Sequence, residues 1–141
     1  MLQTPTEITR NRMRRTRQRD TACEIHLRRE LYRRGFRYLV DVAPIRGQRV
    51  RADILFRRAR LAVFVDGCFW HMCPLHGTLP RTNQEWWRTK LAANVTRDVR
   101  NRTLLESEGW QTIRVWEHED PLSAAERIAE TLMANRRNVI A

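Results

Sequence analysis

Two short apolar segments that are separated by four residues constrain the fold of this chain more than any other feature. Residues 50–56 and 61–66 both have the composition of a β-strand, and three of the four residues between them are arginine. A connection of this length leaves room only for a tight turn, which pairs Phe56 with Leu61. The sequence therefore predicts an antiparallel hairpin whose register is set by its turn.

The remaining segments predict a mixed α/β fold. Asp20 or Thr21 can cap a helix that Gly35 would end. The other expected elements are a strand over 36–42, an irregular segment over 67–82, a helix over 83–108 that could break near Asn94, a strand over 110–116 and an amphipathic helix over 123–136. A mixed sheet with helices on both faces is the simplest packing of this order, which resembles that of the restriction-endonuclease-like nuclease core.

Positive charge dominates the chain and predicts a polyanionic partner. Lysine and arginine total 27 against 16 acidic residues, and Lys90 is the only lysine. Neutralising phosphates releases condensed counterions, so this excess favours nucleic acid. No apolar run is long enough to cross a bilayer, and residues 1–20 lack the apolar centre of a signal peptide. We expect a cytoplasmic protein, associated with the nucleoid when bound to DNA, that does not bind membranes and acts as a monomer.

The distribution of basic and apolar residues divides the chain into two regions. Residues 1–19 form a basic arm with few apolar side chains, which could order on a phosphate backbone or remain a solvated tail, and residues 20–141 form a single domain. We expect Arg14, Arg15 and Arg19 of the arm to contact DNA.

Three acidic residues are candidates for catalysis. Asp53 interrupts an otherwise apolar strand, and the hairpin register places it near the backbone of Val65 and Asp66. A carboxylate and a carbonyl at this position can hold Mg²⁺ with several waters, and such an ion stabilises charge on a phosphodiester. The structural alternatives are a surface charge or an ion pair with Arg51 for Asp53, a turn signal for Asp66, and favourable placement near a helix N-terminus for Glu24.

A cysteine and histidine cluster follows the hairpin. Cys68, Cys73 and His76, together with His118 from the end of the last predicted strand, could form a structural zinc site, because zinc takes four such ligands. His71 is then left over and becomes a candidate general acid or base near Asp53. The alternatives are a chance clustering of buried cysteines, or His71 as a ligand in place of His76.

Aromatic residues lie within the same arginine-rich region. Phe69 and Trp70 belong to the irregular segment, and Trp86 and Trp87 follow it. Aromatics in such a setting can stack on bases or wedge between base pairs, although tryptophans are more often core residues.

At this point the chain resembles the very short patch repair (Vsr) endonucleases. The resemblance covers about residues 8–120 in the same order. It rests on four motifs, namely Val63-Phe64-Val65-Asp66-Gly67-Cys68-Phe69-Trp70-His71, Arg19-Asp20-Thr21-x2-Glu24, Trp87-x2-Lys90-Leu91-x2-Asn94-Val95-x-Arg97-Asp98 and Gly109-Trp110-x5-Trp116-Glu117.

The resemblance implies a restriction-endonuclease-like fold with structural Zn²⁺ and catalytic Mg²⁺. It implies Asp53 as the principal metal ligand, His71 as the catalytic histidine and Glu24 as an active-site acid. Phe69, Trp70 and Trp87 match the family's intercalating aromatics, and we expect Asn94 and Arg97 to contact DNA. The implied reaction is hydrolysis of the phosphodiester 5′ to the thymine of a T:G mismatch, with a cytosine-5 methyltransferase as functional companion.

This chain departs from the family at Asp66, where some members have histidine, and in its zinc spacing. The lysine usual beside this position in the wider nuclease superfamily is also missing, so that His71 would replace its role. Two alternatives stay open, namely a zinc-stabilised DNA-binding module without catalysis and a related nuclease with a different substrate.

Overall fold

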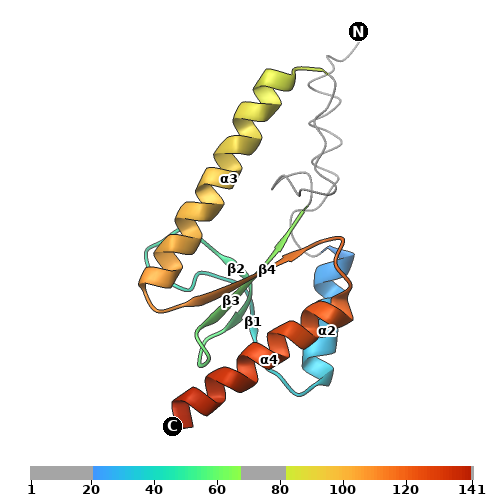
Figure 1. Cartoon of the computed structure of the whole chain (residues 1–141), viewed down its shortest axis with the longest axis vertical. Coiled ribbons are helices and arrows are strands. Elements are labelled where there is room, and N and C mark those ends of the chain that lie inside the picture. The colour runs from blue at the N-terminus through green and yellow to red at the C-terminus, as the bar shows by residue number, and fades with distance from the viewer. Residues whose placement is uncertain (1–20, 68–81, 141) are drawn as a thin grey trace.

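The computed structural model describes residues 21–67 and 82–140, with side chains up to residue 136. The elements are α2 (Ala22–Arg33), β1 (Leu39–Val42), β2 (Ala52–Phe56), β3 (Leu61–Asp66), α3 (Gln84–Ser107), β4 (Gln111–Trp116) and α4 (Pro121–Ile140) (Figure 1). The predicted basic arm and most of the cysteine and histidine cluster lie outside the described residues.

The four strands form one mixed sheet in the order β1-β2-β3-β4. The first two pairings are antiparallel, whereas β4 runs parallel to β3 after a crossover through α3. Phe56 pairs with Leu61, which confirms the predicted hairpin and its four-residue turn. The same register continued by one residue beyond Ile54↔Val63 places Asp53 opposite Phe64, toward the end of the sheet where β3 ends.

Two of the helices end in the same left-handed glycine motif. Gly35 has φ +97° and Gly109 has φ +85°, a region that residues with a side chain adopt at a cost. After α2, the N–H of Phe36 donates to the carbonyl of Leu31 at 3.0 Å, and after α3 the N–H of Trp110 donates to that of Leu105 at 2.9 Å. These bonds satisfy carbonyls that the helix end would leave unpaired, and they confirm that Gly35 ends the first predicted helix.

Alternating strand side chains build two apolar clusters. The larger cluster joins α2 and α4 to the sheet through Ile54, Val63, Val65, Val115 and their neighbours. The smaller cluster contains Leu55 and Ala62, from the alternate positions of β2 and β3, together with Leu105 of α3 and Trp110. Helices therefore pack against both sets of strand side chains, as predicted, and this mixed sheet fits a restriction-endonuclease-like core.

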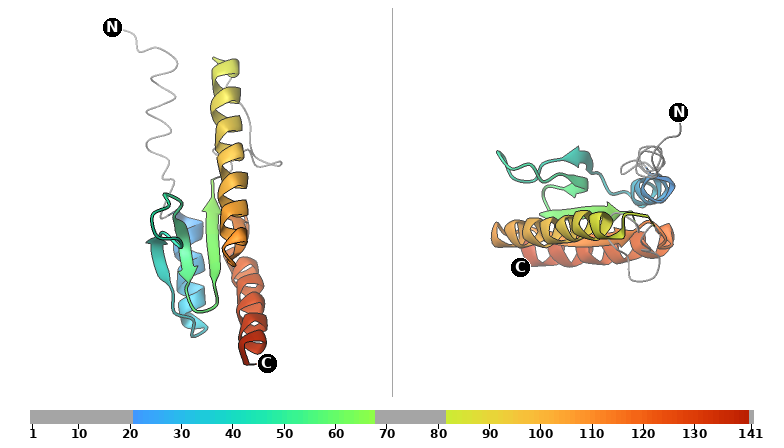
Figure 2. Two further views of the ribbon diagram at one scale, coloured as in Figure 1. Left: turned by 90° about the vertical axis from the view of Figure 1, so that its left-hand side faces the viewer. Right: turned by 90° about the horizontal axis from the view of Figure 1, so that it is seen from above.

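Helix α3 covers the sheet with only its C-terminal part. Its buried residues are Trp87 and Leu91 near one end and Leu105 near the other. The N-terminal half projects well beyond the strands (Figures 1 and 2). The helix is continuous, so the break considered near Asn94 is absent.

Element bounds differ from the prediction at β1, β2 and α4, and β2 begins at Ala52 and not at residue 50. Strand β1 begins at Leu39 and not at residue 36, because Phe36 belongs to the cap of α2 and Phe36 and Tyr38 pack against the larger apolar cluster. Helix α4 is longer than predicted at both ends. None of the helices within residues 21–67 and 82–140 is long and apolar enough to cross a membrane.

Candidate active site

Asp53 lies in a groove between the sheet and α3. The groove has a volume of about 300 Å³, and arginines from several elements line it together with Asp53, Asp66 and Asp98. The N–H of Val65 donates to Oδ2 of Asp53 at 2.7 Å, so the predicted proximity of Asp53 to the backbone of β3 is confirmed. This bond fixes the carboxylate against the strand without neutralising it.

The surroundings of Asp53 oppose its ionisation. Burial is the largest cause and raises the pKa of Asp53 to about 7, although the hydrogen bond from Val65 lowers it. The negative charges of Glu24, Asp66 and Asp41 raise it further. A cation bound at this carboxylate would offset the free-energy cost of ionising it in a buried site. Oxygen ligands prefer hard divalent ions. The donor set at Asp53 therefore fits a metal such as Mg²⁺.

Glu24 is a buried carboxylate on the first turn of α2. Its side chain is 1% exposed and lies 3.4 Å from Nη1 of Arg28. Its backbone N–H donates to the hydroxyl of Thr21, so Thr21 is the residue that caps the predicted helix. Glu24 raises the pKa of Asp53 through its charge. The helix cap thus holds a second carboxylate in the electrostatic environment of Asp53.

Asp66 is also buried, and an arginine from the neighbouring strand forms an ion pair with it. Nε of Arg114, in β4, forms an ion pair with Oδ2 of Asp66. Nη2 of the same guanidinium donates to Oδ2 of Asp98 on α3 at 3.1 Å. The guanidinium also lies over the ring of Trp116, 4.9 Å from its centroid. Arg114 therefore joins β3, β4 and α3 beside Asp53.

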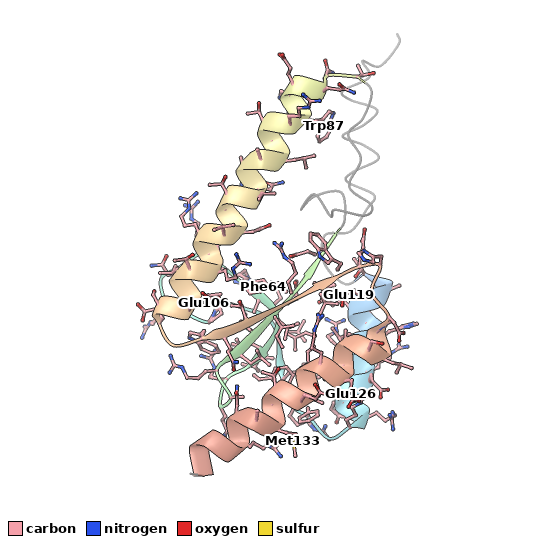
Figure 3. The ribbon with its side chains drawn as sticks, in the orientation of Figure 1. Phe64, Trp87, Glu106, Glu119, Glu126 and Met133 are labelled. Carbon is pink, nitrogen blue, oxygen red and sulfur yellow. The ribbon has the colours of Figure 1, made fainter. Side chains whose placement is uncertain are left out.

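Of the helix residues predicted to contact DNA, Arg97 is exposed and lines the groove, whereas Asn94 is half-buried. Trp87 lies near the end of α3 that is remote from the sheet (Figure 3). It is 2% exposed and packs edge-to-face against Trp86, which is 43% exposed. The structure thus presents Trp86 to solvent, and contact between Trp87 and DNA stays a prediction that requires the side chain to be uncovered.

Several predicted site residues lie outside the described part of the chain. They are the catalytic candidate His71, the zinc candidates Cys68, Cys73 and His76, and the DNA-contact candidates Arg14, Arg15, Arg19, Phe69 and Trp70. The fourth zinc candidate, His118, is exposed in the turn after β4. Within residues 21–67 and 82–140, no three histidine, cysteine or acidic side chains lie close enough together to hold a metal ion.

Sequence reasoning missed two residues of this groove and its surroundings. Arg114 is a charged residue between Ile113 and Val115 of β4, so a charge within a strand, the signal that identified Asp53, could also have identified Arg114. Asp41 lies on β1 opposite Asp53 by register, and it binds Nε of Arg51 at 3.0 Å. The alternative in which Arg51 pairs with Asp53 is therefore not what the structure shows.

Together these residues can bind the sugar-phosphate backbone of a nucleic acid and polarise one of its phosphate groups. Arginines supply positive charge along the groove, and the carboxylate at its end fits a divalent ion. Such a combination of cation and guanidinium groups stabilises negative charge that develops at phosphorus.

Comparisons with known proteins identify the family of this chain. The sequence model of the family described as DNA mismatch endonuclease Vsr matches residues 4–75. The type II nicking enzyme V.NaeI of Lentzea aerocolonigenes is 42% identical over 122 residues, which cover 85% of this chain and 74% of the relative. The type II nicking enzyme V.XorIIP of Xanthomonas oryzae pv. oryzae is 36% identical over 80% of this chain and 82% of its own. The DNA mismatch endonuclease Vsr of Escherichia coli K12 is 38% identical over 70% of this chain and 62% of its own. The chain therefore belongs to the Vsr family and is a DNA endonuclease.

Proposed function

We propose that this endonuclease uses Mg²⁺ to nick one strand of duplex DNA at the phosphodiester 5′ to the thymine of a T:G mismatch. Such mismatches arise when 5-methylcytosine deaminates, so the nick would start very short patch repair. The observation that carries the proposal is the buried carboxylate of Asp53, held by Val65 at the end of an arginine-lined groove in a chain of the Vsr family.

Asp53 and the carbonyl of Val65 would hold the Mg²⁺ ion. When bound, the ion supplies positive charge that stabilises the phosphorane-like transition state and favours ionisation of a water. The chain positions the carboxylate through the N–H of Val65. Glu24, buried beneath the first turn of α2, would orient His71, to which we assign proton transfer. Asp66 would support the site through its ion pair with Arg114.

The segment after β3 would be a zinc-stabilised loop that carries the DNA-contacting aromatics. We assign Cys68, Cys73, His76 and His118 to the zinc and Phe69, Trp70 and Trp87 to intercalation at the mismatch. Residues 1–19 would form an arm on the DNA backbone through Arg14, Arg15 and Arg19, outside a single nuclease domain over residues 20–141. Asn94 and Arg97 would extend this contact along α3.

The functional companion would be a cytosine-5 methyltransferase, because methylation creates the base whose deamination gives the mismatch. The enzyme would act as a monomer on a single lesion.

A nicking assay tests the substrate. Labelled duplexes with one T:G pair, and matched T:A and C:G controls in the same flanking sequences, are incubated with the full chain with and without Mg²⁺. We expect cleavage only in the strand that carries the mismatched thymine, at the phosphodiester 5′ to that thymine, and only with Mg²⁺. Equal cutting of matched duplexes would keep the nuclease and remove the repair role. Tight binding without cutting in any sequence context would favour a zinc-stabilised DNA-binding module.

A further inference from the structure

The Asp66–Arg114–Asp98 cluster has a feature that structural ion pairing does not account for. Each carboxylate engages one nitrogen of the guanidinium, Asp66 through Nε and Asp98 through Nη2. Within residues 21–67 and 82–140, no group accepts a hydrogen bond from the third nitrogen, Nη1. The Arg114 side chain is 36% exposed, so the group is accessible from the groove.

Asp66 and Asp98 hold the guanidinium of Arg114 from two sides, and this clamp also fixes the direction of the guanidinium. A surface arginine loses much conformational freedom when it binds a phosphate, whereas the two carboxylates and the Trp116 ring already restrict Arg114. A planar guanidinium held on two edges presents its remaining donors in one direction, which suits an oxygen of a phosphate. Preorganised donors of this kind stabilise charge better than mobile ones.

The cluster lies in the groove that holds the Asp53 carboxylate. Arg114 and Asp53 line the same groove. Asp66 ends β3, whose Val65 binds Asp53, and β4 runs parallel beside it. An oxygen that approaches the Asp53 carboxylate is therefore also close to this strand end. The other arginines of the groove come from the connection before β2 and from α3.

We propose that Arg114 is a catalytic residue that donates from Nη1 to a non-bridging oxygen of the DNA phosphate bound in the Asp53 groove, and that Asp66 and Asp98 are the residues that position it. The inference rests on the proposed function for the identity of the reaction, and on the clamp geometry for the contact itself.

A single substitution of Arg114 does not test this idea cleanly, because it removes an ion pair of the buried Asp66 and destabilises the fold. The double variant Asp66→Asn/Arg114→Met removes both charges together. It keeps the net charge of the groove and should recover most of the thermal stability that Arg114→Met loses. The matched control is Arg57→Met, which removes one exposed arginine in the β2–β3 turn at the other end of the sheet.

The first measurement is single-turnover nicking of the T:G duplex with Mg²⁺. We expect the double variant to be about 100-fold slower than the wild type, as for the loss of one preorganised donor. Arg57→Met should cut at the wild-type rate. Arg114→Lys keeps the charge but cannot bind both carboxylates and a phosphate in one plane, so we expect an intermediate rate.

The second measurement locates the contact without catalysis. Duplexes that carry a single methylphosphonate at successive positions around the mismatch are titrated without added Mg²⁺, which prevents cleavage and leaves the proposed structural zinc in place. The wild type and Arg57→Met should lose about tenfold in affinity at one phosphate beside the cleavage site, and the double variant should lose nothing there. The slope of log K against log salt should fall by about 0.9 in the double variant, although its net charge is unchanged.

The outcomes separate the inference from the proposed function. If the double variant nicks at the wild-type rate and has the wild-type methylphosphonate profile, Arg114 serves only to neutralise Asp66 and the inference is wrong. If the wild type cuts matched DNA or none at all, but its methylphosphonate profile still depends on Arg114, the phosphate contact stands and the mismatch assignment fails.

Discussion

The two faces of the sheet differ in what they bury. On the face toward α2 and α4, the strands contribute Ile54, Val63, Val65 and Val115, all almost inaccessible to solvent. On the face toward α3 the apolar cluster is smaller, and Asp53, Asp66 and Arg114 lie beside it in the groove. Burial of apolar surface stabilises a fold, whereas burial of a charge costs free energy unless it is compensated.

The difference shows that the residues that stabilise the fold and the residues of the groove lie on opposite faces of the same strands, because side chains alternate along each strand. Neighbouring residues of one strand point to opposite faces, so Ile54 can belong to the core while Asp53 belongs to the groove. The C-terminal half of α3 borders the groove, whereas its N-terminal half projects beyond the strands (Figure 2). Substitutions in the groove should therefore lower nicking activity with little loss of stability. Substitutions in the larger apolar cluster should lower stability and leave the activity of the folded protein unchanged.

The largest effect is expected on the groove face, from Asp53→Asn. Loss of the metal-binding carboxylate should slow single-turnover nicking by about 1,000-fold or more, since a bound metal contributes several kcal/mol to the transition state. Binding to uncleaved duplex without added Mg²⁺ should change little. Nicking at a comparable rate would remove Asp53 from the mechanism and would break the proposed division between the faces.

On the opposite face, Ile128→Ala should act on folding alone. Ile128 is fully buried between α4 and the sheet, and a cavity there should lower the free energy of unfolding in urea by about 2–5 kcal/mol. The nicking rate per folded molecule should stay at the wild-type value. Val99→Ala, at an exposed position of α3, is the control and should change stability by less than about 0.5 kcal/mol.

A smaller effect should sharpen the comparison, because Glu24 comes from the helix of the apolar face but acts on the groove. Glu24→Gln removes a negative charge that raises the pKa of Asp53, so this pKa should fall by a fraction of a unit. Carboxyl chemical shifts recorded against pH in metal-free protein measure it. Glu130→Gln, on the exposed side of α4, should leave the Asp53 titration where it is; equal shifts in both variants would contradict the electrostatic link.

The sequence predicted the centre of the sheet better than its margins. The β2–β3 register followed from a turn of fixed length, and both bounds of β3 were correct because its apolar run ends at an Asp-Gly pair. Strand β1 was harder, because Phe36 and Tyr38 have strand-like composition but pack beside the cap of α2. Likewise, Asn94 carries no signal that distinguishes a helix break from a continuous helix.

The site was predictable only where local pattern sufficed. Asp53 stood out as a charge inside an apolar strand, and the hairpin register placed it beside Val65. The role of Arg114 depends on α3 crossing the sheet, which brings Asp98 within 3.1 Å of a residue 16 positions later. No periodicity in the sequence reports such a crossing, so the clamp required the three-dimensional structure.

The most direct test of the account is the thermal stability of wild type and Asp53→Asn as a function of pH, with and without Mg²⁺. The pKa of Asp53 is about 7 in the folded protein against 3.8 as its ordinary value, so between these values the folded state binds the extra proton. Stability of the metal-free wild type relative to the variant should therefore fall as pH rises through this window, by up to about 4 kcal/mol. At pH 8, Mg²⁺ should restore stability to the wild type and leave Asp53→Asn unchanged. A variant that shows the same pH dependence and the same response to Mg²⁺ as the wild type would contradict the claim that Asp53 is the metal-binding carboxylate.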